Sequence, residues 1–125
     1  ELVRTTGEVL FGGRLQPAYV LRSKEIELTT TQNISKVFDN ISIEIEVSRQ
    51  KDELNKLILR AKDNQAKTPI NDLRATLIKK DVELESYITR NGKAIFENIK
   101  PGHYAIQISD IEKPIGLIIL ELNKA

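Results

Sequence analysis

The chain has 125 residues, with 19 basic and 18 acidic side chains, one His and no Cys, Met or Trp. This length is typical of one domain. A formal net charge of +1 argues against a nucleic-acid partner, because it gives no positive field to attract one. The absence of Cys excludes disulfides, thiol nucleophiles and thiolate metal sites, and no apolar run reaches the length of about 18 residues that a membrane-spanning helix needs.

The composition favours strands. Ile supplies 17 residues, whereas the aromatic side chains are three Tyr and three Phe, a β-branched balance that predicts an ordered all-β domain. The chain starts at Glu1 rather than at Met, and its first residues do not resemble a signal peptide. We therefore expect a piece of a longer or processed protein, with a membrane anchor outside this chain as one interpretation.

Residues 1–40 are predicted to form a β-rich extension or part of a preceding domain. Short strands are expected at Val9–Phe11 and Ala18–Leu21, on either side of a break at Gly12-Gly13, and a further alternating stretch covers residues 25–29. A segment of about 40 residues cannot hold a hydrophobic core alone. We expect it to pack on the rest of the chain or on a neighbouring chain.

The end of this extension is more polar. The run Thr29–Asn33 predicts a loop, and Ile34–Asp39 predicts one helical turn. The next residues, Ile41–Val47, alternate apolar and polar side chains as a half-buried antiparallel strand does. Residues 51–66 fit both a helical stripe and a strand alternation. A strand is favoured there because strands flank the segment, and the helix stays open.

Further strands and turns follow in regular succession. Asn91-Gly92 is the strongest turn signal, because both residues accept a positive φ angle, and Pro101-Gly102 is a second turn. Residues 115–122 are apolar on both faces until Glu121, which predicts a central or covered strand. The other predicted strands lie at Leu73–Leu77, Val82–Glu85, Ala94–Ile99 and Tyr104–Ile108.

A family pattern runs through this part of the chain. Gly92, Phe96, Pro101-Gly102 and Tyr104, with Ile at the Leu positions, follow the form G-x-x-x-F-x-x-L-x-P-G-x-Y-x-L-x-I. The stretch resembles the carboxypeptidase regulatory-like domain, a transthyretin-like β-sandwich, best over residues 73–108 and more loosely over 41–122. The resemblance implies an all-β, Greek-key sandwich of about seven strands over residues 41–125. It implies little about function.

The predicted core has six members. Tyr104 is expected to bury its ring while its hydroxyl finds a partner, as in the tyrosine corner of other sandwiches. The members are Ile43, Ile45, Phe96, Ile99, Tyr104 and Ile106.

No residue is predicted to be catalytic, to bind a cofactor or to hold a metal. His103 is the sole His and lacks partners for a metal site or for acid–base work, so an exposed turn residue is expected. The carboxylates fit solvated strand faces and loops better than a calcium site. They are Glu44, Glu46, Asp81, Glu83, Glu85, Asp110 and Glu112.

Motifs for enzymatic chemistry are also missing. Gly12-Gly13 and Lys79-Lys80-Asp81 do not form a phosphate-binding loop, and no Ser lies in a G-x-S-x-G context. Transthyretin-like folds include hydroxyisourate hydrolases, but their catalytic histidines and terminal Tyr-Arg-Gly-Ser sequence are absent. The sequons at Asn33 and Asn40 matter only in a eukaryotic secretory setting.

The sequence favours a non-catalytic β-sandwich module of a larger, extracytoplasmic (periplasmic or cell-surface) bacterial protein. Such a module serves as a spacer, a sensor ectodomain or a unit that binds a protein or a cell-surface polysaccharide. One alternative is a structural assembly subunit, in which residues 1–40 add a strand to a neighbouring sheet or residues 115–122 form a contact between copies. The second alternative is a small hydrolase that uses His103, Arg74 and Asp110.

Overall fold

The computed structural model describes residues 3–10, 14–16 and 31–123. One group of strands consists of β1 (Val3–Leu10), β2 (Arg14–Gln16), β6 (Arg74–Lys79), β7 (Val82–Ile88), β9 (Gly102–Ser109) and β10 (Pro114–Leu122). The other consists of β3 (Thr31–Phe38), β4 (Ile41–Arg49), β5 (Asn55–Asp63) and β8 (Lys93–Ile99), with a short 3-10 turn, η2 (Lys51–Glu53), between β4 and β5.

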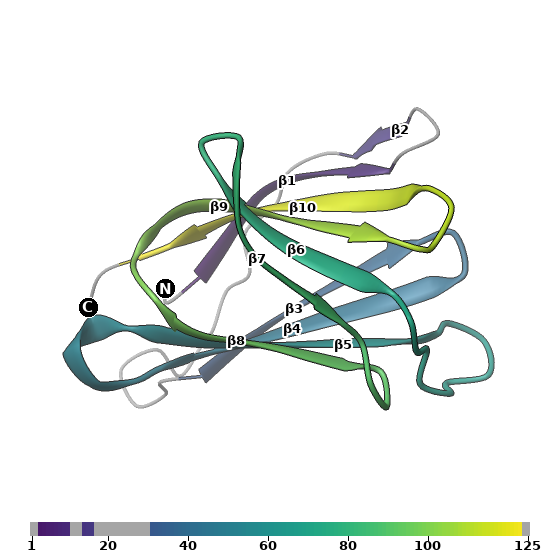
Figure 1. Cartoon of the computed structure of the whole chain (residues 1–125), viewed down its shortest axis with the longest axis horizontal. Coiled ribbons are helices and arrows are strands. Elements are labelled where there is room, and N and C mark those ends of the chain that lie inside the picture. Colours follow the sequence, from purple (N-terminus) through teal and green to yellow (C-terminus); the bar gives the residue numbers. More distant parts are fainter. Residues whose placement is uncertain (1–2, 11–13, 17–30, 124–125) are drawn as a thin grey trace.

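These strands form two antiparallel sheets that pack face to face (Figure 1). The six-stranded sheet has the order β2-β1-β10-β9-β6-β7, and the four-stranded sheet has the order β3-β4-β5-β8. The predicted all-β sandwich is thereby confirmed. The strands from β4 to β10 account for the seven predicted between residues 41 and 122, and the strand interpretation of the ambiguous segment is correct for Asn55–Asp63.

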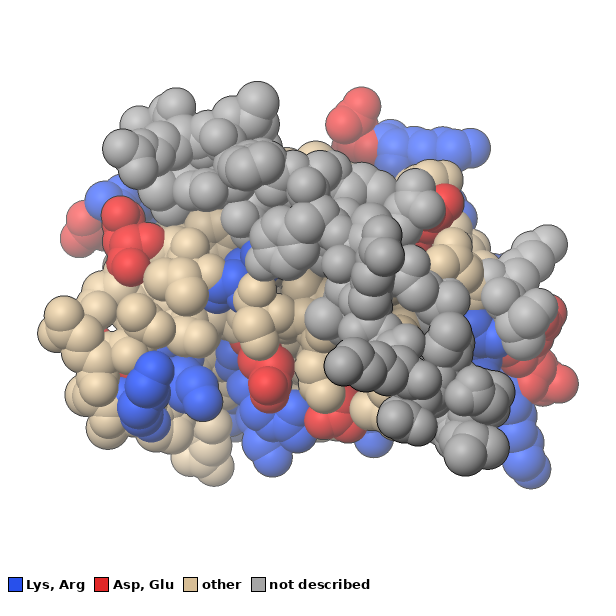
Figure 2. Space-filling model, turned by 180° about the vertical axis from the view of Figure 1, so that it is seen from behind, with Lys and Arg blue, Asp and Glu red and all other residues tan. Residues whose placement is uncertain are grey.

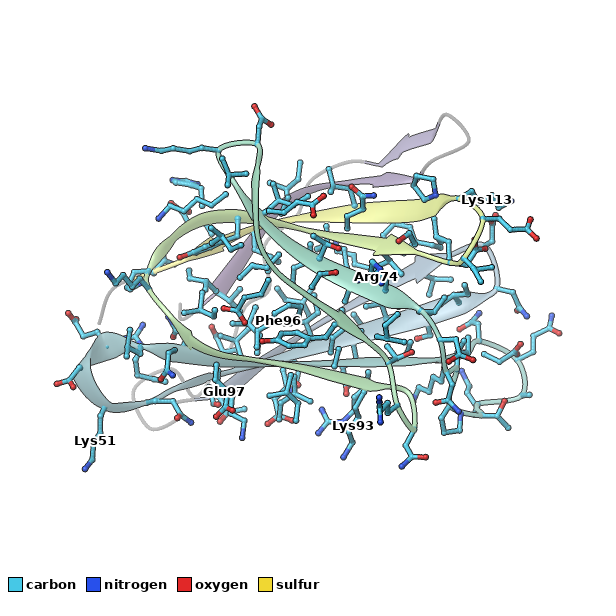
Figure 3. All side chains as sticks on the ribbon, viewed as in Figure 1. Lys51, Arg74, Lys93, Phe96, Glu97 and Lys113 are labelled. Carbon is cyan, nitrogen blue, oxygen red and sulfur yellow. The ribbon has the colours of Figure 1, made fainter. Side chains whose placement is uncertain are left out.

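The core lies between the two sheets, where alternate side chains of each strand meet. All six predicted core residues are buried, and Ile43, Ile45, Phe96 and Ile106 are fully so. Burying a side chain of this size stabilises the fold by about 1.5–3 kcal/mol relative to leaving it exposed. Figure 3 shows the alternation on β8, where Phe96 points between the sheets and Lys93 and Glu97 point away from them.

Two predictions near residue 35 are wrong. β3 replaces the part of the expected loop that the structure describes, Thr31–Asn33, and the expected helical turn at Ile34–Asp39; it pairs with β4 along its whole length from Thr31 to Phe38. Residues 29 and 30 of the expected loop lie outside the described residues. The inner face of β3 carries two polar side chains, Gln32 and Lys36, both buried. Polar residues at inward positions hide the alternation from which a strand is predicted.

The first strand is longer than expected and belongs to the same sandwich. β1 begins at Val3 rather than at Val9, and it pairs with β10 from Val3–Leu122 to Leu10–Gly116. β10 is therefore an inner strand with β1 on one side and β9 on the other, which confirms its predicted central position. The strands predicted at 18–21 and 25–29, and the break at Gly12-Gly13, lie outside the described residues.

The chain turns at Asn91-Gly92 and at Pro101-Gly102, as the sequence predicts. Asn91 and Gly92 have φ angles of 51° and 74°. They close a two-residue turn in which Arg90 and Lys93 exchange two backbone hydrogen bonds of 2.9 Å. After the second turn, the hydroxyl of Tyr104 donates to the carbonyl of Lys100 at 2.7 Å. This is the predicted pairing of a buried ring with a satisfied hydroxyl.

Candidate functional site

The edge strand β7 carries four of the seven exposed large hydrophobic side chains among the residues whose burial is described. Among the described strands, β6 alone pairs with it, and every residue from 82 to 88 is exposed or half-buried. Its exposed large side chains are Val82 at 58%, Leu84 at 49%, and Tyr87 and Ile88 at 42% each. An edge that is both open and apolar marks a surface where another chain can dock.

The pairing of β7 with β6 explains why the side chains of β7 are not fully buried in the core. Its pairing with β6 shifts register so that Leu77 lies opposite Glu85 and Ile78 lies opposite Glu83. Leu84 is left over as a β-bulge, which bends the strand. Tyr87 anchors the strand, because its ring packs edge-on against the buried Phe96 with the centroids 5.2 Å apart.

The edge carries negative charge beside its apolar side chains. The hydroxyl of Tyr87 donates to Glu85 Oε1 at 2.8 Å. This hydrogen bond and the charges of Glu85 and Glu97 raise the pKa of the Tyr87 phenol, because all of them disfavour a phenolate. Glu83 is also exposed, so β7 itself carries two carboxylates beside its apolar side chains.

A cleft of about 760 Å³ opens at the end of β7. The segment between β5 and β6 and the turn between β9 and β10 line it, together with Ile88, the last residue of β7. The β7 edge and the cleft are therefore continuous, and we call them the edge site. The residues that line the cleft are Ile70, Asn71, Asp72, Leu73, Arg74, Ile88, Asp110 and Ile111.

The polar groups of the cleft are held by the backbone or by neighbouring side chains. Asp110 Oδ1 accepts hydrogen bonds from the N–H groups of Lys113 and Glu112, at 2.8 Å each, and these bonds lower the pKa of the carboxyl. Arg74 Nη1 donates to Ser86 Oγ at 3.0 Å, which leaves its other N–H groups for a ligand.

The lining combines apolar walls with a few hydrogen-bonding groups, as clefts for ligands do. Ile111 is 97% exposed at the cleft, so an occupant would cover apolar surface that water now contacts. Among the described residues, no three His, Cys, Asp or Glu side chains lie close enough to hold a metal ion.

The residues that the sequence singled out are dispersed. His103 is 76% exposed, with Nε2 3.4 Å from Glu121 Oε2, and it lies near the start of β9, whereas Asp110 follows the end of that strand. At about 3.3 Å per residue, the length of β9 separates the two by roughly 20 Å. Arg74 and Asp110 meet at the cleft, but His103 does not join them.

The other acidic candidates also lie apart. Glu44 and Glu46 are on the outer face of the four-stranded sheet, where both approach Arg60. Asp81, Glu83 and Glu85 belong to the β6–β7 hairpin. The sequon residues are exposed, Asn33 on β3 and Asn40 in the following turn, where its Nδ2 donates to Asp63 at 2.9 Å.

Sequence reasoning missed the edge site. In residues 82–88, apolar residues occur at both even and odd positions, and two Glu residues interrupt them. This pattern was the available signal for a strand that does not bury one whole face in the core. The segment 70–72 gave no signal, because its place at the cleft depends on the pairing of β6 with both β7 and β9.

The remaining surface and the comparisons add little to the site. On the face seen in Figure 2, the described basic and acidic side chains are interspersed. Nowhere in the described ranges does a helix have the length and apolarity to cross a membrane. The chain matches no protein-family model, no curated protein and no solved structure.

Proposed function

We propose that this chain is a non-catalytic β-sandwich module that binds an extended segment of a partner protein along the β7 edge. The observation that carries the proposal is the exposure of β7, which has one side that no described strand pairs and four exposed large apolar side chains. An added strand would take up the open backbone groups and cover these side chains. This is the physical basis of recognition by strand addition.

The charge of the β7 edge indicates which kind of peptide segment it would bind. Glu83, Glu85 and Glu97 favour a segment in which Lys or Arg alternates with apolar residues. A second copy of β7 fits less well, because an antiparallel pair centred on Glu85 would place two like carboxylates opposite each other. The next side chain of the segment, beyond Ile88, would enter the cleft.

The alternative functions have less support. β10 is paired on both sides, so residues 115–122 offer no open edge for assembly. Residues 1–40 do contain edge strands, β2 and β3, but β3 exposes one large apolar side chain, Val37, where β7 exposes four. The hydrolase hypothesis needs His103 and Asp110 together, but they lie at opposite ends of β9. The open backbone side of β7 and its aliphatic side chains, Val82, Leu84 and Ile88, also favour a protein over a polysaccharide.

The wider setting is part of the same proposal. The sandwich, with Gly92, Phe96, Pro101-Gly102 and Tyr104 in the spacing of the carboxypeptidase regulatory-like pattern, supports membership of that class. Its use as a spacer or recognition unit in a larger extracytoplasmic bacterial protein is consistent with a function that depends on surface rather than on chemistry.

The test uses the isotope-labelled chain and a synthetic seven-residue peptide of alternating Lys and Val, with blocked ends. We expect the peptide to shift the amide signals of residues 82–88 and of Asp72 and Asp110. A peptide of alternating Glu and Val should leave them unchanged. Signals that move elsewhere, do not move, or move equally with both peptides would refute the proposal.

A pair of variants sharpens the test. Leu84→Lys adds a positive charge to the edge and should weaken binding of the Lys–Val peptide. Val37→Lys is a matched control, because Val37 is also 49% exposed on an edge strand, β3, of the other sheet. The two variants should differ clearly in affinity while both retain the spectrum of a folded sandwich. Equal weakening would contradict the assignment to β7.

A further inference from the structure

A second concave surface lies on the outer side of the four-stranded sheet, where β5 meets the turn before β8. It is a groove of about 130 Å³, and it shares no lining residue with the edge site. Besides backbone of the Asn91-Gly92 turn, its lining includes Glu44 and four basic side chains, Arg60, Lys62, Lys67 and Lys93. We call this surface the basic groove.

The sheet register places like charges next to one another in the basic groove. Arg60 lies directly opposite Lys93 across the β5–β8 pair, and Lys62 is two residues from Arg60 on the same face. Like charges in cross-strand positions destabilise a sheet. Arg60 also lies opposite Glu44 across the β4–β5 pair, so the excess positive charge of the groove falls on the lysines around it.

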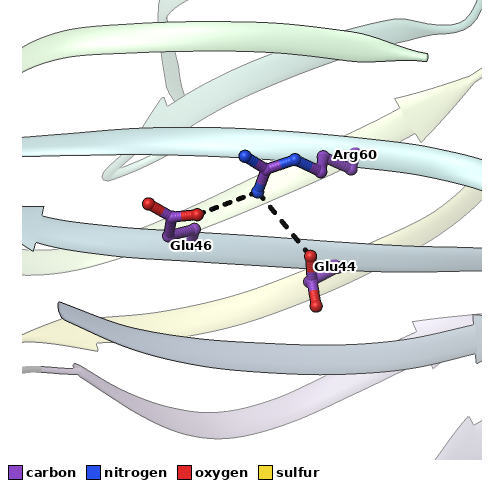
Figure 4. Close-up of polar contacts among 3 residues, drawn as sticks. All are labelled: Glu44, Glu46 and Arg60. Carbon is purple, nitrogen blue, oxygen red and sulfur yellow. Dashed lines mark hydrogen bonds and ion pairs between the residues drawn. The ribbon is translucent and has the colours of Figure 1, made fainter.

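Only one of the four positive charges is balanced by carboxylates. Arg60 Nη1 lies 3.0 Å from Glu46 Oε1 and 3.6 Å from Glu44 Oε1, so that it bridges both side chains (Figure 4). Lys62, Lys67 and Lys93 form no ion pair with any carboxylate in the part of the chain that the structure describes. Three ammonium groups therefore border the groove with their charges available.

Backbone hydrogen bonds fix the positions from which these lysines extend. The N–H of Ala61 donates to the carbonyl of Gly92 at 2.7 Å, which holds the turn before Lys93 on β5. The N–H of Lys67 donates to the carbonyl of Asp63 at 2.8 Å. Gly92 is required for this fit, because a Cβ there would lie 2.7 Å from the carbonyl oxygen of Ala61.

We infer that the basic groove binds an oxyanion group, phosphate or sulfate, through Lys62, Lys67 and Lys93. The ammonium groups act as strongly hydrated point charges, a mode in which lysine binds phosphate. The small volume suits one such group rather than a polynucleotide backbone. Because the lysines are exposed, the interaction is weak and is screened by salt.

The first experiment follows backbone amide signals while inorganic phosphate is added to the full chain in low salt, and then repeats the titration with sulfate. We expect saturable shifts at residues 62, 67 and 91–93, and their loss in about 0.5 M sodium chloride, where the Debye length is about 4 Å. A sulfated disaccharide and its unsulfated form then separate a free ion from a group carried on a saccharide. Shifts that do not saturate, or that lie elsewhere, would overturn the inference.

Paired variants provide the control. Lys67→Gln with Lys93→Gln removes two charges from the groove, and we expect phosphate binding to weaken by about fivefold or more. Lys51→Gln with Lys113→Gln removes the same charge from exposed positions outside the groove (Figure 3). That variant should bind phosphate within about twofold of the parent chain. Equal weakening in the two variants would mean attraction by overall charge and would refute a specific site.

Discussion

Gly116 of β10 lies directly against the ring of Phe38 in β3, so closely that a Cβ at residue 116 would come within 2.6 Å of two ring carbons. The contact joins the two sheets, because β10 belongs to the six-stranded sheet and β3 to the four-stranded one. Phe38 is buried. The sandwich closes at this point because residue 116 has no side chain.

Because of the Gly116–Phe38 contact, we expect a larger residue at 116 to clash with the ring, and a smaller residue at 38 to relieve the clash. We expect Gly116→Ala to lower the free energy of unfolding by about 1–3 kcal/mol, as overpacking of a core does. Urea denaturation measures the loss. Combined with Phe38→Leu, the substitution should cost less than the sum of the two single variants. Strict additivity would show that the ring and residue 116 are not in contact.

We expect the buried polar side chain of Asn55 to contribute to stability through its hydrogen bonds. The side chain is fully buried, and its Nδ2 donates to the carbonyl of Ile99 at 3.1 Å while its Oδ1 accepts from Arg49 Nε at 3.2 Å. Asn55→Ala leaves a buried carbonyl unsatisfied, so we expect a loss of about 1–3 kcal/mol in denaturant unfolding. Asn33→Ala, at an exposed position, should change stability by less than about 0.5 kcal/mol.

Tyr104 predicts a stability change in alkaline solution. Burial raises the pKa of its phenol above the ordinary value of 10.0. Its contribution is therefore complete below pH 10 and declines as the pH rises through the folded-state pKa, because the unfolded chain ionises first. Tyr104→Phe should cost about 1 kcal/mol near neutral pH through loss of the bond to Lys100.

Unfolding of the parent chain and of this variant, compared from pH 7 to above pH 10, checks both expectations. The difference in stability should shrink in the alkaline range, because the variant has no phenol to ionise. A difference that stays constant or grows would contradict the raised pKa of Tyr104.

Asp110 predicts the opposite dependence in acid. The N–H groups of Lys113 and Glu112 hold the pKa of its carboxyl below the ordinary value of 3.8. The stability that these bonds contribute is present above that value and is lost as the pH falls through the lower folded-state pKa. Carboxyl carbon NMR should show Asp110 titrating at lower pH in the native chain than in the urea-unfolded chain. Identical titrations would mean that the turn does not hold the carboxylate.

Much of the sandwich could be predicted because its strands follow simple local rules. The alternation at Ile41–Val47, the turn at Asn91-Gly92 and the Pro101-Gly102 corner before Tyr104 each depend on neighbouring residues only. The central position of residues 115–122 was also evident, since a strand that is apolar on both faces needs cover on both faces. None of these signals depends on a distant part of the chain, so they were enough to predict the fold class that the structure confirms.

The parts that could not be predicted depend on distant contacts. β3 was missed because Gln32 and Lys36 occupy inward positions, where Gln32 Oε1 accepts a hydrogen bond from the N–H of Val3 at 2.8 Å. The cleft was missed because Arg74 and Asp110 come together only when β6 pairs with β9. Neither relationship has a signal in the sequence near the residues concerned.

The pairing of β1 with β10 has a consequence for how the chain folds. The hairpins β3–β4, β4–β5, β6–β7 and β9–β10 connect strands that follow one another in sequence, whereas Val3 must find Leu122. Closing so long a loop costs entropy before it gains contacts, and such pairings slow folding. We expect β1 to join the sheet last. Until it does, the apolar strand β10 is an open edge to which another unfolded chain can attach.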